Sequence, residues 1–184
     1  MKTLIYNGER VLLAITIGAM LTSFGLSEGW AQQKHKISGK ALAENAKYTQ
    51  QHVIDVGDVP GHQVRIFEIH RTYPKDAPVF EGVKVVEEWV RGFSDYTDIN
   101  GRAVTYYIYV VENGDKIFAR SNAVTQTIVN PNGSKRSTVT GVATITGGTG
   151  KFLTIRGTIR STVIIDPKAG FSESQFEGEY WIQK

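Results

Sequence analysis

The residues best suited to chemistry in this sequence are three charged side chains, Glu87, Arg91 and Asp95, spaced four positions apart. Side chains alternate between the two faces of a strand, so an extended stretch would place all three on one face. Charges on an otherwise apolar face are costly unless they are paired, and Arg91 could reach both carboxylates. The set is either a structural ion-pair cluster or a polar anchor for a ligand. A single β-bulge would replace Glu87 with Glu88 on this face.

Aromatic side chains accompany these charges. Trp89 and Phe93 alternate with them along the same stretch, and Tyr106 and Ser121 are predicted to lie beside them on the next strands. Apolar walls with a few convergent polar groups are typical of small-molecule sites. The pattern therefore predicts a pocket for an apolar or aromatic molecule.

Two glycines, Gly141 and Gly157, are predicted to face each other on the inner side of neighbouring strands. Glycine in a strand either lets strands coil closely or leaves space for a ligand, and both interpretations remain open here. The glycine-rich stretch 147–150 is not predicted to bind phosphate. A phosphate loop needs a helix behind it, whereas a strand is expected after this turn.

Metal, cofactor and nucleic-acid chemistry find little support in the sequence. Glu68 and His70 would share one face of a strand over 62–72, but a metal site needs a third ligand. The other histidines, His35, His52 and His62, show no ligand spacing. A net charge of +3 over 184 residues gives no concentrated basic stripe of the kind that nucleic-acid binding requires. We therefore predict no metal, no cofactor and no nucleic-acid partner.

The elements that must position these residues are strands. Beyond Gly61, short runs rich in Val, Ile, Thr, Tyr and Phe alternate with turn signals. Asn-Gly pairs at 100–101 and 113–114 predict two-residue hairpin turns, which would direct Tyr106 and Ile108 inward. The segments 130–133 and 148–150 suit three-residue loops. Successive hairpins with one apolar face each predict an all-β fold, a closed antiparallel meander barrel of about eight strands.

The first 31 residues have the layout of a secretory signal peptide. Lys2 and Arg10 precede an apolar run over 11–26, and small residues then flank Trp30 at a potential cleavage site. We expect residues 32–184 to form one exported domain, periplasmic or extracellular, with no membrane attachment after cleavage. The chain has no cysteine, so the domain must rely on its core rather than on disulfides.

Residues 147–152, Gly-Gly-Thr-Gly-Lys-Phe, are followed by Arg156-Gly157, and this pattern resembles the allene oxide cyclase-like and dirigent-like barrel proteins. The stretches 56–62 and 177–181 look like those of secreted bacterial members of unassigned function. The resemblance is clear over 134–184 and loose over 36–133. It implies an eight-stranded antiparallel barrel, sometimes oligomeric, whose apolar lumen steers ring closure or radical coupling of a lipid-like or phenolic substrate. The family's catalytic residues have no residue-by-residue counterparts here.

Three functions follow as hypotheses. The favoured one is a binding module that holds a small apolar or aromatic molecule in its lumen. The second is a cyclase or isomerase that folds a substrate against Trp89 and Phe93, with Glu87 or Asp95 steering charge. The third is a purely structural or homo-oligomerising barrel.

Overall fold

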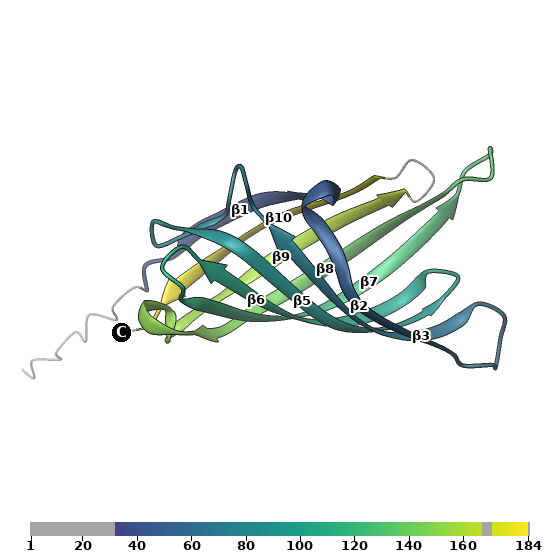
Figure 1. The fold of residues 1–184 in the computed structure, drawn as a ribbon, viewed down its shortest axis with the longest axis horizontal. Helices are drawn as coiled ribbons and strands as arrows, with labels where there is room; N and C mark the ends of the chain where they lie inside the picture. Colours follow the sequence, from purple (N-terminus) through teal and green to yellow (C-terminus); the bar gives the residue numbers. More distant parts are fainter. Residues whose placement is uncertain (1–31, 167–170, 184) are drawn as a thin grey trace, which may run out of the picture. The chain divides into compact units, whose positions relative to one another are not determined.

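The computed structural model describes residues 32–166 and 171–183, and the predicted signal peptide lies outside these described residues. The described residues are built almost wholly of β-strands, with two short 3-10 turns, η1 (Ala43–Asn45) and η2 (Gly150–Phe152) (Figure 1). The strands are β1 (His35–Leu42), β2 (Ala46–Asp55), β3 (His62–Thr72), β4 (Val79–Phe80), β5 (Val83–Thr97), β6 (Asn100–Val111), β7 (Lys116–Val129), β8 (Lys135–Gly148), β9 (Ile155–Asp166) and β10 (Phe171–Ile182).

The strands form one antiparallel, ten-stranded sheet in the order β1-β10-β9-β8-β7-β6-β5-β3-β2, with β4 paired to β5. Successive strands from β5 to β10 are neighbours, so the predicted all-β meander is confirmed. The predicted closure into a barrel is wrong. β1 pairs only with β10 and β2 pairs only with β3 among the described residues, so these two strands are the edges of the sheet. The turn η1 joins them without bringing their backbones into a hydrogen-bonded register.

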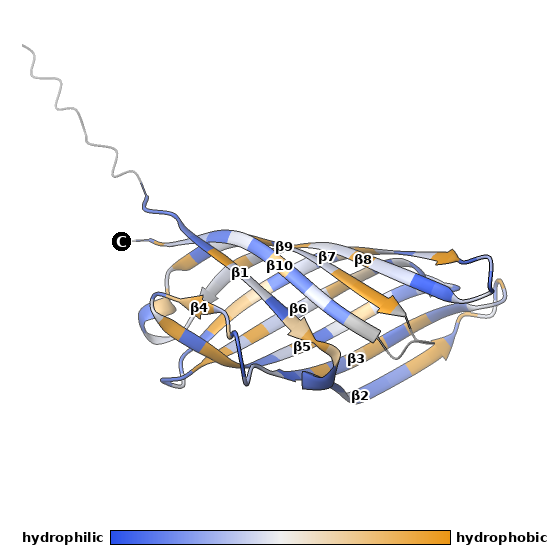
Figure 2. Cartoon of the chain, turned by 90° about the horizontal axis from the view of Figure 1, so that it is seen from above, coloured by the Kyte–Doolittle hydropathy of each residue, from blue (hydrophilic) through white to orange (hydrophobic). Residues whose placement is uncertain are grey.

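The hydrophobic core lies on the inner face of the curled sheet, at the end that carries η2 and β4. Phe80 and Phe152 are fully buried there, and Tyr180 from the last strand packs against Phe80 with ring centroids 5.1 Å apart. Alternating hydropathy along the strands produces this inner face (Figure 2). The remaining fully buried aliphatic side chains of this cluster are Val85, Val111, Ile117, Ile145 and Ile155.

The loop between β7 and β8 has the predicted form. Val129 pairs with Lys135, and Ala123 pairs with Gly141, as a three-residue loop requires. Gly133 has φ +75°, the left-handed conformation expected at the last loop position. The inner faces of β7 and β8 were therefore predicted correctly.

The two Asn-Gly turns differ from their prediction. Between β6 and β7, the Gly114 amide donates to the Val111 carbonyl and the Val111 amide to Asp115, so the loop has three residues, not two. The positive φ falls on Gly114 alone, whereas a two-residue type I′ turn needs it at both positions. This shifts the register by one and turns Tyr106 and Ile108 outward. Between β5 and β6, the turn residues are Asp98 and Ile99, before the Asn-Gly pair.

The glycine-rich motif at residues 147–152 joins two hairpin ends through hydrogen bonds. The Thr149 hydroxyl accepts the Lys116 amide at 2.8 Å and donates to Asp115 at 3.2 Å, while the Thr149 amide donates to the Lys116 carbonyl. A side chain at Gly150 would collide with the Asp115 carboxylate. The motif therefore docks η2 on the β6–β7 turn and places Phe152 in the core.

No helix within the described residues is long and apolar enough to cross a membrane.

Candidate functional site

A cavity of about 490 Å³ lies on the inner face of the sheet, toward the end away from the Phe80–Phe152 core. Its walls come from strands β2, β3 and β5–β9, and from the turns at Gly61 and Ile99. A volume of this size is within the range of small-molecule sites. The principal side chains that line it are Arg65, Phe67, Ile69, Arg71, Val90, Tyr96, Thr105, Tyr107, Thr125, Val139, Val163 and Ile165.

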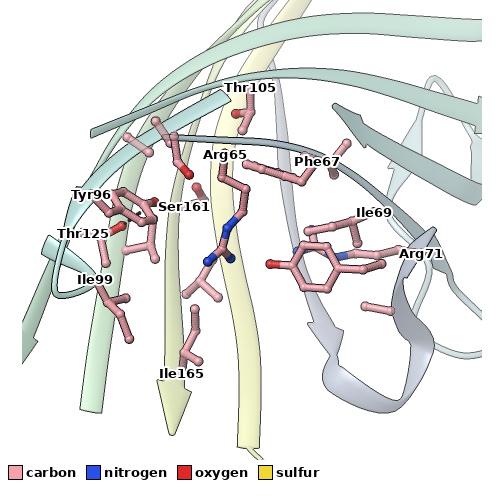
Figure 3. Close-up of a pocket in the computed structure, with 18 of the residues that line it drawn as sticks. Arg65, Phe67, Ile69, Arg71, Tyr96, Ile99, Thr105, Thr125, Ser161 and Ile165 are labelled. Carbon is pink, nitrogen blue, oxygen red and sulfur yellow. Dashed lines mark hydrogen bonds between the residues drawn. The ribbon is translucent and has the colours of Figure 1, made fainter. Parts of the chain in front are cut away.

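Strand β3 supplies both arginines of the cavity, and Lys47 of β2 is the third charged side chain in its lining. Arg65 reaches into the middle of the space, with Tyr96 and Ile99 on one side and Ile69 and Arg71 on the other (Figure 3). The register explains this placement, because residues two apart along β3 face inward together.

A buried ion pair lies at the inner end of the cavity. Arg71 Nη1 is 3.0 Å from Glu88 Oε1, and the Tyr73 hydroxyl donates to the other carboxylate oxygen. Glu88 is only 3% exposed. Burial, followed by the nearby Glu88 charge, raises the pKa of Tyr73 well above its ordinary value. For Arg71, burial disfavours the charge, but Glu88 and the surrounding phenols outweigh it and hold the pKa above its usual value. Both oxygens of the Glu88 carboxylate are hydrogen-bonded, so we interpret the pair as a structural element at the base of the cavity.

Three hydroxyl groups meet at one level of the inner face. Thr105 and Ser121 are cross-strand partners, and the Tyr107 phenol lies close to both. Burial raises the pKa of Tyr107, and the two neighbouring hydroxyls offset part of this effect. Neither the Thr105 nor the Ser121 hydroxyl makes a hydrogen bond of standard geometry with a described residue. Thr105 lines the cavity, but its hydroxyl oxygen is buried and not exposed to the open space.

The predicted inner triad of Glu87, Arg91 and Asp95 lies on the outer face, so that prediction is wrong. The register of β5 against β6 shifts between Val85 and Glu87. Val85 faces the core as expected, but the bulge turns the following side chains over, and Glu88 becomes the inner carboxylate. The weighed alternative of Glu88 is therefore the one that the structure shows.

On the outer face these side chains form exposed pairs. Arg91 Nε is 2.7 Å from Glu68, with the Arg91 side chain 49% exposed. Hydrogen bonds from Thr49 and Arg91 lower the pKa of Glu68. Trp89 stacks on His70 with centroids 4.2 Å apart and donates to Glu87 at 3.2 Å.

The aromatic residues predicted to hold a ligand are also outside. Phe93 is 45% exposed and Tyr106 is 54% exposed, and neither lines the cavity. Ser121 alone among the predicted pocket side chains lies on the inner face, where it is buried. The charge-steering role proposed for Glu87 or Asp95 therefore has no cavity to act in.

The two inner glycines do not face each other. Gly141 pairs with Ser161, and Gly157 pairs with Ile145 and Tyr180. A Cβ at Gly157 would collide with the Glu179 carbonyl and lie 2.8 Å from the Tyr180 Cα, so the missing side chain admits the neighbouring strand. The close-packing interpretation of Gly157 is the correct one.

Asp95 has a different partner from the predicted one. His62 lies between two carboxylates, with Nε2 2.8 Å from Asp95 and Nδ1 2.6 Å from Asp58. The hydrogen bond with Asp95, then that with Asp58, raises the pKa of His62, and the His62 hydrogen bond lowers the pKa of Asp58. His62 therefore stabilises the folded state below its ordinary pKa of 6.5, and this stabilisation is lost as the pH rises through the raised pKa of the folded protein. Asp58 stabilises the folded state above its ordinary pKa of 3.8, and this stabilisation is lost as the pH falls through the lowered pKa of the folded protein.

We expect Asp95→Asn to lower the pKa of His62 more than Asp58→Asn does, because the Asp95 hydrogen bond has the larger effect. The measurement is an NMR pH titration of the His62 ring protons. Asp55→Asn is the matched control, since Asp55 bonds to Gln63 instead, at 2.8 Å. An unchanged His62 titration in Asp95→Asn would contradict the bridged geometry.

Sequence reasoning missed the cavity residues of β3. Arg65 and Arg71 give the inner face of this strand a polar pattern, whereas Val64 and Ile66 share the opposite face with Glu68 and His70. Ile66 is in fact 65% exposed. The available signal was Phe67 and Ile69 between the two arginines.

Fold and site together define an all-β domain whose curled sheet has a packed core at one end of its inner face and a cavity at the other. Comparison with protein-family models and with curated proteins finds no match to this chain. Among the described residues, no group of three or more His, Asp or Glu side chains could hold a metal ion.

Proposed function

We propose that this domain binds a small apolar or aromatic molecule in the cavity between β3 and β9. The observation that supports the proposal is the uneven filling of the inner face. One end is packed with Phe80, Phe152 and their neighbours, while the other keeps about 490 Å³ between aromatic and aliphatic walls. Interiors are normally close-packed, so a retained cavity of this size is a feature with a cost.

The sequence supports two further parts of the proposal, the location of the domain and its family. We propose that the domain acts outside the cytoplasm, after removal of residues 1–31, and that it is a secreted relative of the allene oxide cyclase-like and dirigent-like barrels. The glycine-rich motif at 147–152 supports the second part, since it has a defined structural role in the sheet. Binding rather than turnover is the function that the cavity supports, because its described lining contains no carboxylate.

A thermal-shift screen of apolar and aromatic metabolites tests the proposal. A ligand that binds only the native state, at 100 times its Kd, adds about 2.7 kcal/mol to the free energy of unfolding. For a domain of this size, this corresponds to a rise in Tm of about 5–11 °C. A purely structural or oligomerising domain would show no such rise with any compound.

A matched pair of variants on β8 locates the binding. Val139 lines the cavity, whereas Val142 points outward and is 48% exposed. Val139→Trp should fill the cavity and abolish the ligand-induced rise in Tm, and Val142→Trp should leave it intact. Equal responses in the two variants would place the ligand elsewhere.

A further inference from the structure

The charges around the cavity are unbalanced. Lys47, Arg65 and Arg71 line it, and no described lining residue carries a carboxylate. The charge of Arg71 is balanced by Glu88, whose Oε1 lies 3.0 Å from Arg71 Nη1. Lys47 is exposed at the rim, where water can solvate it.

Arg65 and Lys47 both lack an acidic partner among the described residues, and Arg65 is the one that reaches into the middle of the cavity. It has no carboxylate of a described residue within ion-pair distance. Its polar neighbour is the neutral Gln51, whose amide oxygen, turned toward the guanidinium, lies 3.2 Å from both Nε and Nη1. A guanidinium keeps its charge in any protein environment, so Arg65 brings a full positive charge into a space walled by Phe67, Ile69 and Tyr96.

We infer that the ligand is an aromatic carboxylate, whose anionic group pairs with Arg65. One unmatched guanidinium calls for one negative charge, which favours a carboxylate over a doubly charged phosphate. Arginine binds carboxylates through two parallel hydrogen bonds, and such pairs are strong where water is excluded. The inference rests on the proposed function and adds the chemical class of the ligand.

The walls favour a flat ring as the apolar part of the ligand. Phe67, Tyr96 and Tyr107 come from three different strands and all line the space. Aromatic pairs in offset or edge-to-face arrangements contribute beyond the area that they bury.

The test compares naphthoate with naphthalenemethanol, its uncharged counterpart, by isothermal titration calorimetry. The wild-type protein should bind naphthoate about ten-fold more tightly or better, since a charge-assisted hydrogen bond contributes at least that much. Arg65→Met should remove this preference and leave the affinity for naphthalenemethanol unchanged. Arg102→Met, on the exposed face of β6, should behave like wild type.

The two proposals fail in different ways. Equal binding of both compounds by the wild-type protein, unchanged in Arg65→Met, would overturn the carboxylate inference and leave the aromatic binding function standing. Binding of neither compound would overturn the proposed function, and the inference with it. Retained binding of naphthalenemethanol in Arg65→Met shows that the variant is folded.

Discussion

Arg71→Ala should lower the free energy of unfolding by about 3–5 kcal/mol at neutral pH, a large part of the about 5–15 kcal/mol typical of a domain. The variant leaves the Glu88 carboxylate, 3% exposed, without its cation. The Tyr73 hydroxyl can still donate to Glu88, but one neutral hydrogen bond does not replace an ion pair. Urea titration of the variant and wild type gives the difference.

Acidification should recover part of this loss. A stranded buried carboxylate is more stable in its neutral form, so protonation of Glu88 in the variant removes the penalty as the pH falls. The double variant Arg71→Met with Glu88→Leu should be more stable than Arg71→Ala, because it leaves no unpaired charge. Arg91→Ala is the surface control. The Arg91 side chain is 49% exposed, and its removal opens Glu68 to water, so the change should be about 1 kcal/mol or less. If Arg71→Ala and Arg91→Ala unfold at the same urea concentration, the buried pair does not exist in solution.

Phe152→Ala should destabilise the domain by about 3–5 kcal/mol. The Phe152 ring is fully buried at the packed end of the inner face, where the hydrogen bonds of Thr149 hold the glycine-rich motif in place. Strand ends around it are fixed by turns, so the surrounding side chains can collapse only partly into the space that the ring leaves. Thermal unfolding measures the effect.

Leu153→Ala is the control for this prediction. It is the next residue along the chain and is 67% exposed, so its truncation should change the free energy of unfolding by no more than about 0.5 kcal/mol. A small effect of Phe152→Ala, similar to that of Leu153→Ala, would mean that the glycine-rich motif does not anchor this end of the sheet.

The strands themselves could be predicted from the sequence. Their register was predicted correctly between β7 and β8 and wrongly between β6 and β7. The outer face of β8 is rich in Thr, and that of β7 carries Lys116, Arg120, Asn122 and Gln126. Their loop contains Pro131 and Gly133 at fixed positions, so pattern and turn chemistry agree. β6 has no such asymmetry. Its inner Tyr107 and Tyr109 alternate with outer Tyr106 and Ile108, which are equally hydrophobic. With no pattern to correct it, an error of one residue at Gly114 exchanged the two faces.

The candidate site was mispredicted because of this error and because of a bulge in β5. The bulge after Val85 turns the following side chains of β5 to the opposite face of the sheet. No residue type in that stretch predicts a bulge. The predicted inner cluster of a carboxylate and Arg91 is wrong, but a different pair of these residue types lies inside the sheet. They are Glu88 and Arg71, which come from two strands, whereas the prediction paired residues along one strand.

The pairing of β1 with β10 makes the order of synthesis matter. His35 is hydrogen-bonded in register with Tyr180, so the first described strand finds its partner in the last. Contacts this distant in sequence are formed late and slowly, because a long loop must close before they stabilise the chain. Until residues 171–182 exist, β1 has no neighbour and β9 has a bare edge, and bare edges pair readily with other chains. A chain truncated before β10 should therefore aggregate rather than form a smaller sheet, and the final twelve-residue strand decides whether the whole domain folds.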